Sequence, residues 1–259
     1  MKDFNIYNLR MASAMNDKMF FLQHINLRDY DLIVDFGCAT GGLISQLIPF
    51  TSKGKKVQIV GFDINEEMLA HARRNVYGEG ECFEVDFCSD LESINWHLGQ
   101  PHQKTMIIFS SVLHEVPVYE QLKLISLMRK FTTVVIRDMK RPLNNEPISN
   151  RTRKRILAQV APWQAQMFEN YWGKIDDKEK LYRFFLMNEF VENFETEVEE
   201  DYFSVLWSEI VWSLEDEFDI VYESSFTLPY HKQQVKKRFD HVMKDITHKK
   251  LILTKKDNC

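Results

Sequence analysis

Glycine, acidic and hydroxyl residues recur through the first half of this 259-residue sequence in an order suited to holding a polar ligand. The series runs Asp35, Gly37, Asp63, Asp86 and Ser110. Carboxylates accept hydrogen bonds from hydroxyl and ammonium groups, and glycine lets a ligand approach the backbone closely. One such position means little, because surface loops are polar anyway. The ordered series indicates a single binding edge.

Each of these residues lies at or just after the end of a short apolar run with the composition of a buried strand. We predict strands at residues 32–36, 57–62, 82–85, 105–109 and 133–136. We predict helices between them at residues 42–48, 65–73 and 119–130. Strands that alternate with helices form a parallel sheet covered on both faces. Ligands bind beyond the carboxyl ends of such strands, where these residues would meet.

The segment Asp35-Phe36-Gly37-Cys38-Ala39-Thr40-Gly41-Gly42 resembles the cofactor loop of class I S-adenosylmethionine-dependent methyltransferases. The pattern of that family is acid-x-Gly-x-Gly-x-Gly. Gly37 and Gly41 match it, and Ala39 replaces the middle glycine with one extra methyl group. The resemblance covers about residues 30–138. It implies an α/β fold with a Rossmann-like doubly wound sheet, mostly parallel with an antiparallel closing strand, and S-adenosyl-L-methionine as cofactor.

The same resemblance implies roles for the residues at the strand ends. Asp35 would balance the cationic sulfonium and ammonium groups, and Asp63 would accept hydrogen bonds from both ribose hydroxyls. Asp86 would take the adenine amine, while Phe87 either walls the adenine ring or belongs to the core. The predicted cofactor-binding set is Asp35, Gly37, Cys38, Ala39, Gly41, Asp63, Ile64, Asp86, Phe87 and Ser110, and no metal ligand is predicted.

Residues 110–116 occupy the place of the family's fourth motif. Asn-Pro-Pro-Tyr and Asp-Pro-Pro-Tyr are absent, which argues against methylation of base amino groups, and no cysteine follows a proline, which argues against cytosine C5 chemistry. Leu113-His114 is similar to a stretch of small-molecule O-methyltransferases in which the histidine is the general base. We therefore name His114 as the candidate base, with Glu115 either orienting it or solvated. The alternative is that His114 has no chemical role.

The alternation of strands and helices stops after Arg137. We predict a single methyltransferase domain over residues 1–259, with a helical lead-in at 1–30 and a cofactor-binding half at 31–139. A mainly helical insertion after the fifth strand, at 140–215, would cap the substrate. Closing strands would follow within 216–259, at residues 218–222 and 251–254.

The net charge of −5 argues against a uniformly basic nucleic-acid-binding protein. Basic residues nevertheless gather in two stretches, which contain Lys140, Arg141, Arg151, Arg153, Lys154 and Arg155, and then Lys232, Lys236, Lys237, Arg238, Lys244, Lys249 and Lys250. These stretches are either solvated helix faces or two basic lips around an anionic acceptor such as RNA, DNA or a phosphorylated metabolite.

The four cysteines include no Cys-x-x-Cys pair, which disfavours a zinc site and indicates free thiols in a reducing compartment. The first residues lack the basic start and apolar run of a signal peptide. No apolar run reaches the ~18 residues of a membrane span. We therefore expect a cytoplasmic protein that does not bind membranes.

The sequence thus predicts an enzyme that transfers a methyl group from S-adenosylmethionine to an O or N atom of a small molecule. One alternative is a methyltransferase of RNA or another nucleic acid, bound through the basic stretches. Another is a catalytically silent binding protein with a cofactor fold. A nicotinamide oxidoreductase is disfavoured, because Gly-x-Gly-x-x-Gly is absent and an acid precedes the first glycine.

Overall fold

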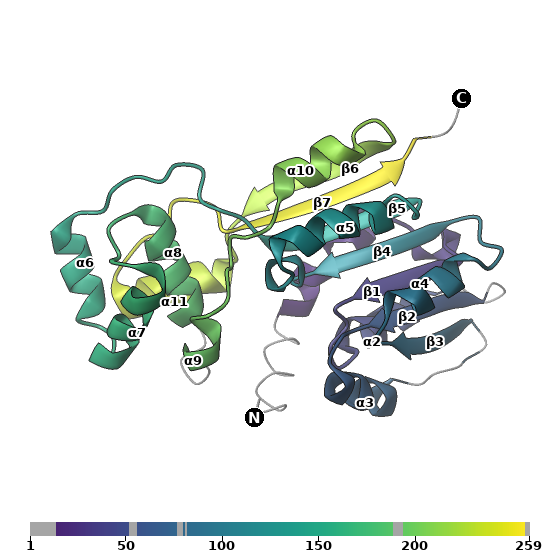
Figure 1. Cartoon of the computed structure of the whole chain (residues 1–259), viewed down its shortest axis with the longest axis horizontal. Helices are drawn as coiled ribbons and strands as arrows, with labels where there is room; N and C mark the ends of the chain where they lie inside the picture. The colour runs from purple at the N-terminus through teal and green to yellow at the C-terminus, as the bar shows by residue number, and fades with distance from the viewer. Residues whose placement is uncertain (1–13, 52–55, 77–79, 81, 189–193, 257–259) are drawn as a thin grey trace. The chain divides into compact units, whose positions relative to one another are not determined.

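The computed structural model describes residues 14–51, 56–76, 80, 82–188 and 194–256. The first thirteen residues of the predicted lead-in and Cys259 lie outside these ranges. The chain divides into two compact units (Figure 1). Unit 1 comprises residues 1–138, 206–223 and 250–259, and unit 2 comprises residues 139–205 and 224–249.

A seven-stranded sheet has the order β3-β2-β1-β4-β5-β7-β6 (Figure 1). Its strands are β1 (Leu32–Phe36), β2 (Val57–Phe62), β3 (Phe83–Cys88), β4 (Thr105–Ser110), β5 (Thr133–Met139), β6 (Phe218–Phe226) and β7 (His248–Lys255). Strands β1 to β5 pair in parallel, and β7 is antiparallel. The predicted Rossmann-like doubly wound sheet with an antiparallel closing strand is therefore confirmed.

The parallel register brings the carboxyl ends of β1, β2 and β4 to one level. Phe36 pairs with Phe62 on one side and with Phe109 on the other. The ring centroid of Phe36 lies 4.4 Å from that of Phe62 and 4.9 Å from that of Phe109. These three rings, here called the aromatic row, pack together near the carboxyl ends of the three strands.

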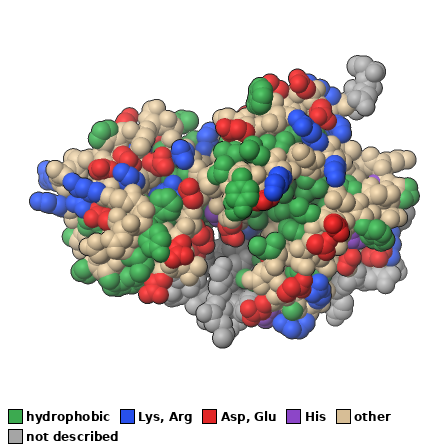
Figure 2. All heavy atoms as spheres, in the orientation of Figure 1, with side chains coloured by type: hydrophobic (Ala, Val, Ile, Leu, Met, Phe, Trp, Pro, Cys, Tyr) green, Lys and Arg blue, Asp and Glu red, His purple; other side chains and the backbone are tan. Residues whose placement is uncertain are grey.

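Helices connect the parallel strands and cover the sheet. They are α2 (Gly42–Leu47), α3 (Glu66–Asn75), α4 (Leu91–Leu98) and α5 (Val118–Met128). Helix α5 packs beside α10 (Trp207–Leu214), and Figure 2 shows hydrophobic side chains gathered over these two helices. Tyr119, Leu122 and Trp212 are exposed there. Within the described ranges, no helix is long and apolar enough to cross a membrane.

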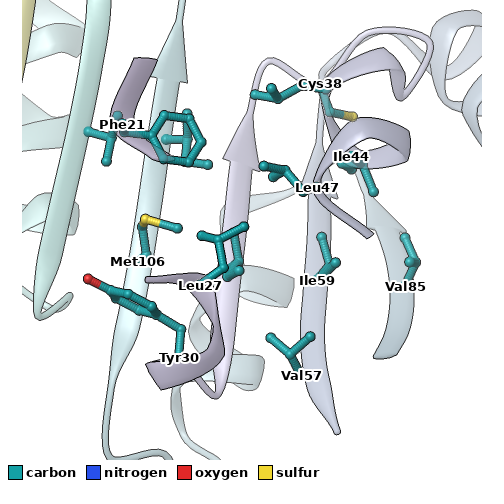
Figure 3. Packing of buried hydrophobic residues seen from close by; sticks show 14 of the residues in the cluster. Phe21, Leu27, Tyr30, Cys38, Ile44, Leu47, Val57, Ile59, Val85 and Met106 are labelled. Atoms are coloured by element: carbon teal, nitrogen blue, oxygen red, sulfur yellow. The ribbon is translucent and has the colours of Figure 1, made fainter. Parts of the chain in front are cut away.

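The main core of unit 1 lies between the sheet and α2. Ile33, Ile59 and Met106 of the sheet are fully buried. They belong to one cluster with residues of α2 and the lead-in (Figure 3), namely Phe21, Leu27, Ile44 and Leu47. This packing fixes α2, and with it the loop that precedes α2, against the end of β1.

The third strand runs beyond its predicted end at residue 85. Strand β3 continues to Cys88, with Asp86 paired to Val60 and Cys88 paired to Phe62. A carboxylate is tolerated inside this strand because β3 lies at the edge of the sheet and the Asp86 side chain is 59% exposed. Asp86 therefore lies within the strand, not at its end as the sequence indicated.

The fifth strand also runs beyond its predicted end at residue 136. Strand β5 includes Arg137 and Asp138, and both are buried. Successive strand residues face opposite sides of a sheet, so each charged side chain needs its own partner. Arg137 Nε donates to Asp17 Oδ2 at 2.8 Å, and Asp138 Oδ1 lies 2.7 Å from His114 Nδ1. Each charged side chain thus has a polar partner on its own face of the sheet, which lets β5 continue through both residues.

Unit 2 contains the predicted helical insertion after the fifth strand. Its helices are α6 (Asn150–Leu157), α7 (Pro162–Trp172), α8 (Lys178–Met187), α9 (Phe194–Glu197) and α11 (Pro229–Phe239). They enclose an aromatic core that includes Phe168, Phe184, Phe185, Tyr202 and Phe239. Helix α11 comes from the second piece of the chain, between β6 and β7, so both pieces build this core.

Candidate active site

The loop between β1 and α2 has a backbone that depends on glycine. Gly37 and Gly41 have φ angles of +80° and +78°, in the left-handed region. A Cβ atom on Gly37 would lie 2.4 Å from Val112 Cγ2, so no side chain fits there. The N–H groups of Gly37 and Cys38 both donate to the Phe62 carbonyl, at 2.7 and 2.9 Å. The loop is thereby tied to the end of β2.

Ala39 occupies the position of the family's middle glycine and also has a positive φ, +48°. This conformation is strained for alanine, so a specific contact must hold it. The Ala39 N–H donates to Asp63 Oδ2 at 2.9 Å. The other oxygen, Asp63 Oδ1, accepts from the Asn65 N–H at 2.9 Å. Asp63 therefore joins the two loops, and each of its oxygens retains a second lone pair for a ligand hydroxyl.

Asp35 is buried near the end of β1, and its Oδ2 has no hydrogen-bond partner among the residues that the structure describes. Burial raises the pKa of Asp35 to about 7; the Lys18 ammonium group opposes this shift, and the Asp63 carboxylate adds to it. Burial, followed by repulsion from Arg137, lowers the pKa of Lys18 to about 8. An orphaned carboxyl oxygen in this place suits a cationic ligand group.

Ion pairs that the sequence did not predict connect the lead-in to the sheet. Arg137 Nη2 lies 2.7 Å from Asp17 Oδ2, and Lys250 Nζ lies 2.5 Å from Asp17 Oδ1. Asp17 precedes Lys18 in the same helical segment, so these ion pairs also hold Lys18 near Asp35. The partners are more than 100 residues apart in the chain, and no local pattern indicates them.

The side chains of three predicted cofactor-binding residues have packing or polar partners within the protein. Phe87 and Cys38 pack in the core, and a Cβ on Gly61 would lie 2.6 Å from Phe87 Cδ1 and 2.9 Å from Cys38 Sγ. Burial raises the pKa of the Cys38 thiol, which disfavours the thiolate form. Asp86 Oδ2 instead faces His97 Nε2 at 3.3 Å, and Asp86 lies two residues before the end of β3. Ile64, beside Asp63, is 81% exposed.

The turn after β4 packs against the glycine loop. Ser110 is buried at the end of β4, and Ser111 has a φ of +60°. The Ser111 N–H donates to the Arg137 carbonyl at 2.7 Å, and Arg137 Nη1 donates to Ser111 Oγ at 2.5 Å. Val112 then packs on Gly37. The turn that carries His114 is thus held beside the predicted cofactor loop.

His114 is buried, and its imidazole contacts a fully buried carboxylate that the sequence analysis did not identify. His114 Nδ1 lies 2.7 Å from Asp138 Oδ1. Asp138 Oδ2 accepts from the N–H groups of Val112 and Leu113, at 3.0 and 2.7 Å. The exposed Glu115 lies further away, with its Oε1 4.0 Å from His114 Nε2. A charged residue closing a β-rich run was the only signal of Asp138 in the sequence.

Residues 33–133 match a family model described as a methyltransferase domain. A SAM-dependent methyltransferase from Archaeoglobus fulgidus has a similar structure, with a TM-score of 0.53 and 13% identity over 98% of this chain and 100% of that chain. The mycolic acid cyclopropane synthase CmaA1, in complex with SAH and CTAB, has a TM-score of 0.53 and 10% identity over 95% of this chain and 85% of that chain. The plantazolicin methyltransferase BamL, in complex with SAH and a triazolic desmethylPZN analog, has a TM-score of 0.50 and 12% identity over 96% of this chain and 86% of that chain. No curated protein matches this chain in sequence.

The family match and the sheet order identify residues 33–133 as an S-adenosylmethionine-dependent methyltransferase domain with the class I fold. The residues present fit this cofactor. The unpartnered Asp35 oxygen suits an ammonium group, and each Asp63 oxygen has a lone pair for a hydroxyl.

Replacing Asp63 with alanine should weaken binding of S-adenosylhomocysteine roughly 10- to 100-fold, as expected for the loss of hydrogen bonds to a charged group. Calorimetric titration measures this. Asp31→Ala is the matched control, because Asp31 Oδ2 also accepts two backbone N–H groups, from Gln103 and Lys104, at the opposite end of β1. Asp31→Ala should lower the melting temperature without changing affinity. Equal losses of affinity in both variants would show that Asp63 acts only through the fold.

Replacing Asp35 with asparagine should stabilise the ligand-free protein above pH 7. The pKa of Asp35 is raised from 3.8 to about 7, so the folded state holds more protons than the unfolded state between these values. The free energy of unfolding contributed by Asp35 therefore falls as the pH rises through that window. We expect Asp35→Asn to gain on the order of 1–3 kcal/mol at pH 8 and much less at pH 4, measured by denaturant titration.

The same variant should lose affinity only for ligands with an ammonium group. S-Adenosylhomocysteine has one, whereas 5′-methylthioadenosine lacks the amino-acid part. At pH 8, Asp35→Asn should weaken binding of the first and leave binding of the second unchanged. Parallel losses for both ligands would contradict a contact between Asp35 and the amino-acid end.

Proposed function

We propose that this enzyme transfers the methyl group of S-adenosylmethionine to an oxygen or nitrogen atom of a small molecule, with His114 as general base. The observation that carries the proposal is the placement of a buried imidazole on a turn that packs against Gly37 of the cofactor loop. Histidine is suited to proton transfer near neutral pH.

The protein contributes mainly alignment and proton transfer. Asp35, Asp63 and the loop from Gly37 to Gly41 hold the cofactor at the ends of β1 and β2. The bound cofactor supplies a methyl group that is electrophilic because it is attached to a sulfonium. Alignment of two reactants is worth up to ~7–11 kcal/mol of the barrier. His114 Nε2 takes the proton that a hydroxyl acceptor loses as its oxygen attacks, and an acceptor that is already a free amine needs no such base at the moment of attack.

The proposal of a small acceptor is supported by the pairing of the basic residues in unit 2. Several of their side chains contact acidic residues of the same unit: Arg141 with Glu179, Arg153 with Glu169, and both Arg155 and Lys236 with Asp240. Basic and acidic side chains accordingly lie side by side in unit 2 (Figure 2). Paired cations contribute little to the release of counterions from a nucleic acid.

Methyl transfer from tritiated S-adenosylmethionine tests the proposal directly. The acceptor panel contains phenols, catechols, aliphatic amines and phosphorylated metabolites, with tRNA and duplex DNA as the alternative class. We expect incorporation into a small molecule and none into nucleic acid. Incorporation into tRNA or DNA that falls steeply with salt would instead assign the enzyme to nucleic acid.

With an acceptor in hand, His114→Ala should lower kcat by roughly 10²–10⁴-fold, the usual contribution of a positioned base. Affinity for S-adenosylhomocysteine should not change. His114→Asn should not restore the rate, because an amide forms hydrogen bonds but takes no proton at neutral pH.

The matched control is His102→Ala, since His102 lies before β4, at the other end of that strand from His114. Its rate should remain that of the wild type. A His114→Ala rate within a few-fold of the wild type would exclude His114 as base and leave alignment alone as the source of catalysis.

A further inference from the structure

Asp138 has the contacts of a residue that holds another group in place. Its side chain is fully buried, and its two oxygens have separate tasks. Oδ1 lies 2.7 Å from His114 Nδ1, while Oδ2 accepts the backbone N–H groups of Val112 and Leu113. A single carboxylate thus grips both the imidazole and the backbone of the turn that carries it.

An ionised carboxylate only accepts hydrogen bonds, so the ring atom facing Asp138 Oδ1 must be a donor. A neutral imidazole has one protonated nitrogen, and a proton on Nδ1 leaves the lone pair on Nε2. Resting on the function proposed above, we infer that Asp138 is the positioning residue of this enzyme. It fixes His114 in the tautomer whose Nε2 is ready to take a proton from the acceptor.

The carboxylate of Glu115, the next residue in the chain, does not oppose this arrangement. Glu115 Oε1 lies 4.0 Å from His114 Nε2, beyond hydrogen-bond distance, and the Glu115 side chain is 57% exposed. Solvent therefore screens its attraction for a proton on Nε2, whereas the contact with Asp138 is short and buried. Burial and the charge of Arg137 lower the pKa of the nearby Lys18 ammonium group. The charges of Asp138 and Glu115 both raise this pKa, as does the charge of Asp35.

A second residue holds the same turn without facing the ring. Gln121 Nε2 donates to the carbonyls of Leu113 and Val116, at 3.0 and 2.9 Å. Gln121 Oε1 accepts the Leu206 N–H at 3.0 Å. Gln121 therefore supports the backbone of the turn, while Asp138 supports both backbone and imidazole. This difference separates structural support from control of the tautomer.

Asp138→Asn is the variant that isolates the tautomer. The amide oxygen can keep the place of Oδ2 and still accept from Val112 and Leu113, so the turn retains its anchor. The amide NH₂ then faces His114 Nδ1 and can only donate to it. The ring must respond by moving its proton to Nε2, which removes the lone pair from the reacting side.

The experiment is two-bond ¹H–¹⁵N correlation NMR of the histidine rings at pH 8 in the ligand-free full-length protein, with His114 assigned by its loss in His114→Gln. In the wild type we expect a protonated Nδ1 and an unprotonated Nε2. In Asp138→Asn the two nitrogens should exchange these states. Turnover of a hydroxyl acceptor should then fall roughly 10²–10⁴-fold, in kcat and not in affinity for S-adenosylhomocysteine.

The control is Gln121→Ala, which should lower the melting temperature and leave the His114 tautomer as in the wild type. A wild-type His114 protonated on Nε2 alone overturns the inference, even if no variant folds. An unchanged tautomer in Asp138→Asn also overturns it. An exchanged tautomer with unchanged turnover shows that Asp138 controls the ring but that His114 is not the base, so the general-base part of the proposed function and the role of Asp138 in catalysis both fail.

Discussion

The parallel pairing of β1 with β2 and with β4 is the constraint on which the rest of the site depends. Because Phe36, Phe62 and Phe109 lie at one level and pack together as the aromatic row, three loops leave the sheet at the same edge. The Phe62 carbonyl then accepts from the glycine loop, and Val112 packs where Gly37 has no side chain. A shift in register of one residue would reverse the facing of every side chain and separate these loops.

Two buried carboxylates of this sheet differ in whether hydrogen bonds offset the free-energy cost of their burial. Asp138 is surrounded by donors: an imidazole and two backbone N–H groups. Asp35 has an oxygen without a hydrogen-bond partner in the described part of the chain, and burial holds its pKa near 7. The first arrangement suits a residue whose task is complete in the free protein. The second suits a residue that completes its contacts with a ligand.

The sequence was sufficient for the order of strands and for the glycine loop, because apolar runs, glycines and acids are local signals. It was not sufficient for the ends of β3 and β5. Asp86 was interpreted as a strand-ending polar residue, although it lies on an exposed edge. The fifth strand was predicted to end before Arg137, although Arg137 pairs with Asp17, 120 residues away. Local composition indicates neither the edge position of Asp86 nor the distant partner of Arg137. The core position of Cys38, next to functional backbone, also depends on packing that only the folded chain defines.

The core of unit 2 is shared by two pieces of chain. The Phe185 ring of the first piece lies 5.0 Å from the Phe239 ring of the second, and Arg238 Nη1 donates to the Asn188 carbonyl at 2.7 Å. Neither piece contains the whole core. Recombination that exchanged only residues 139–205 with a relative would leave mismatched aromatic partners in residues 224–249. Natural or engineered variation of this unit must therefore be bipartite, with compensating substitutions inherited together across the intervening β6.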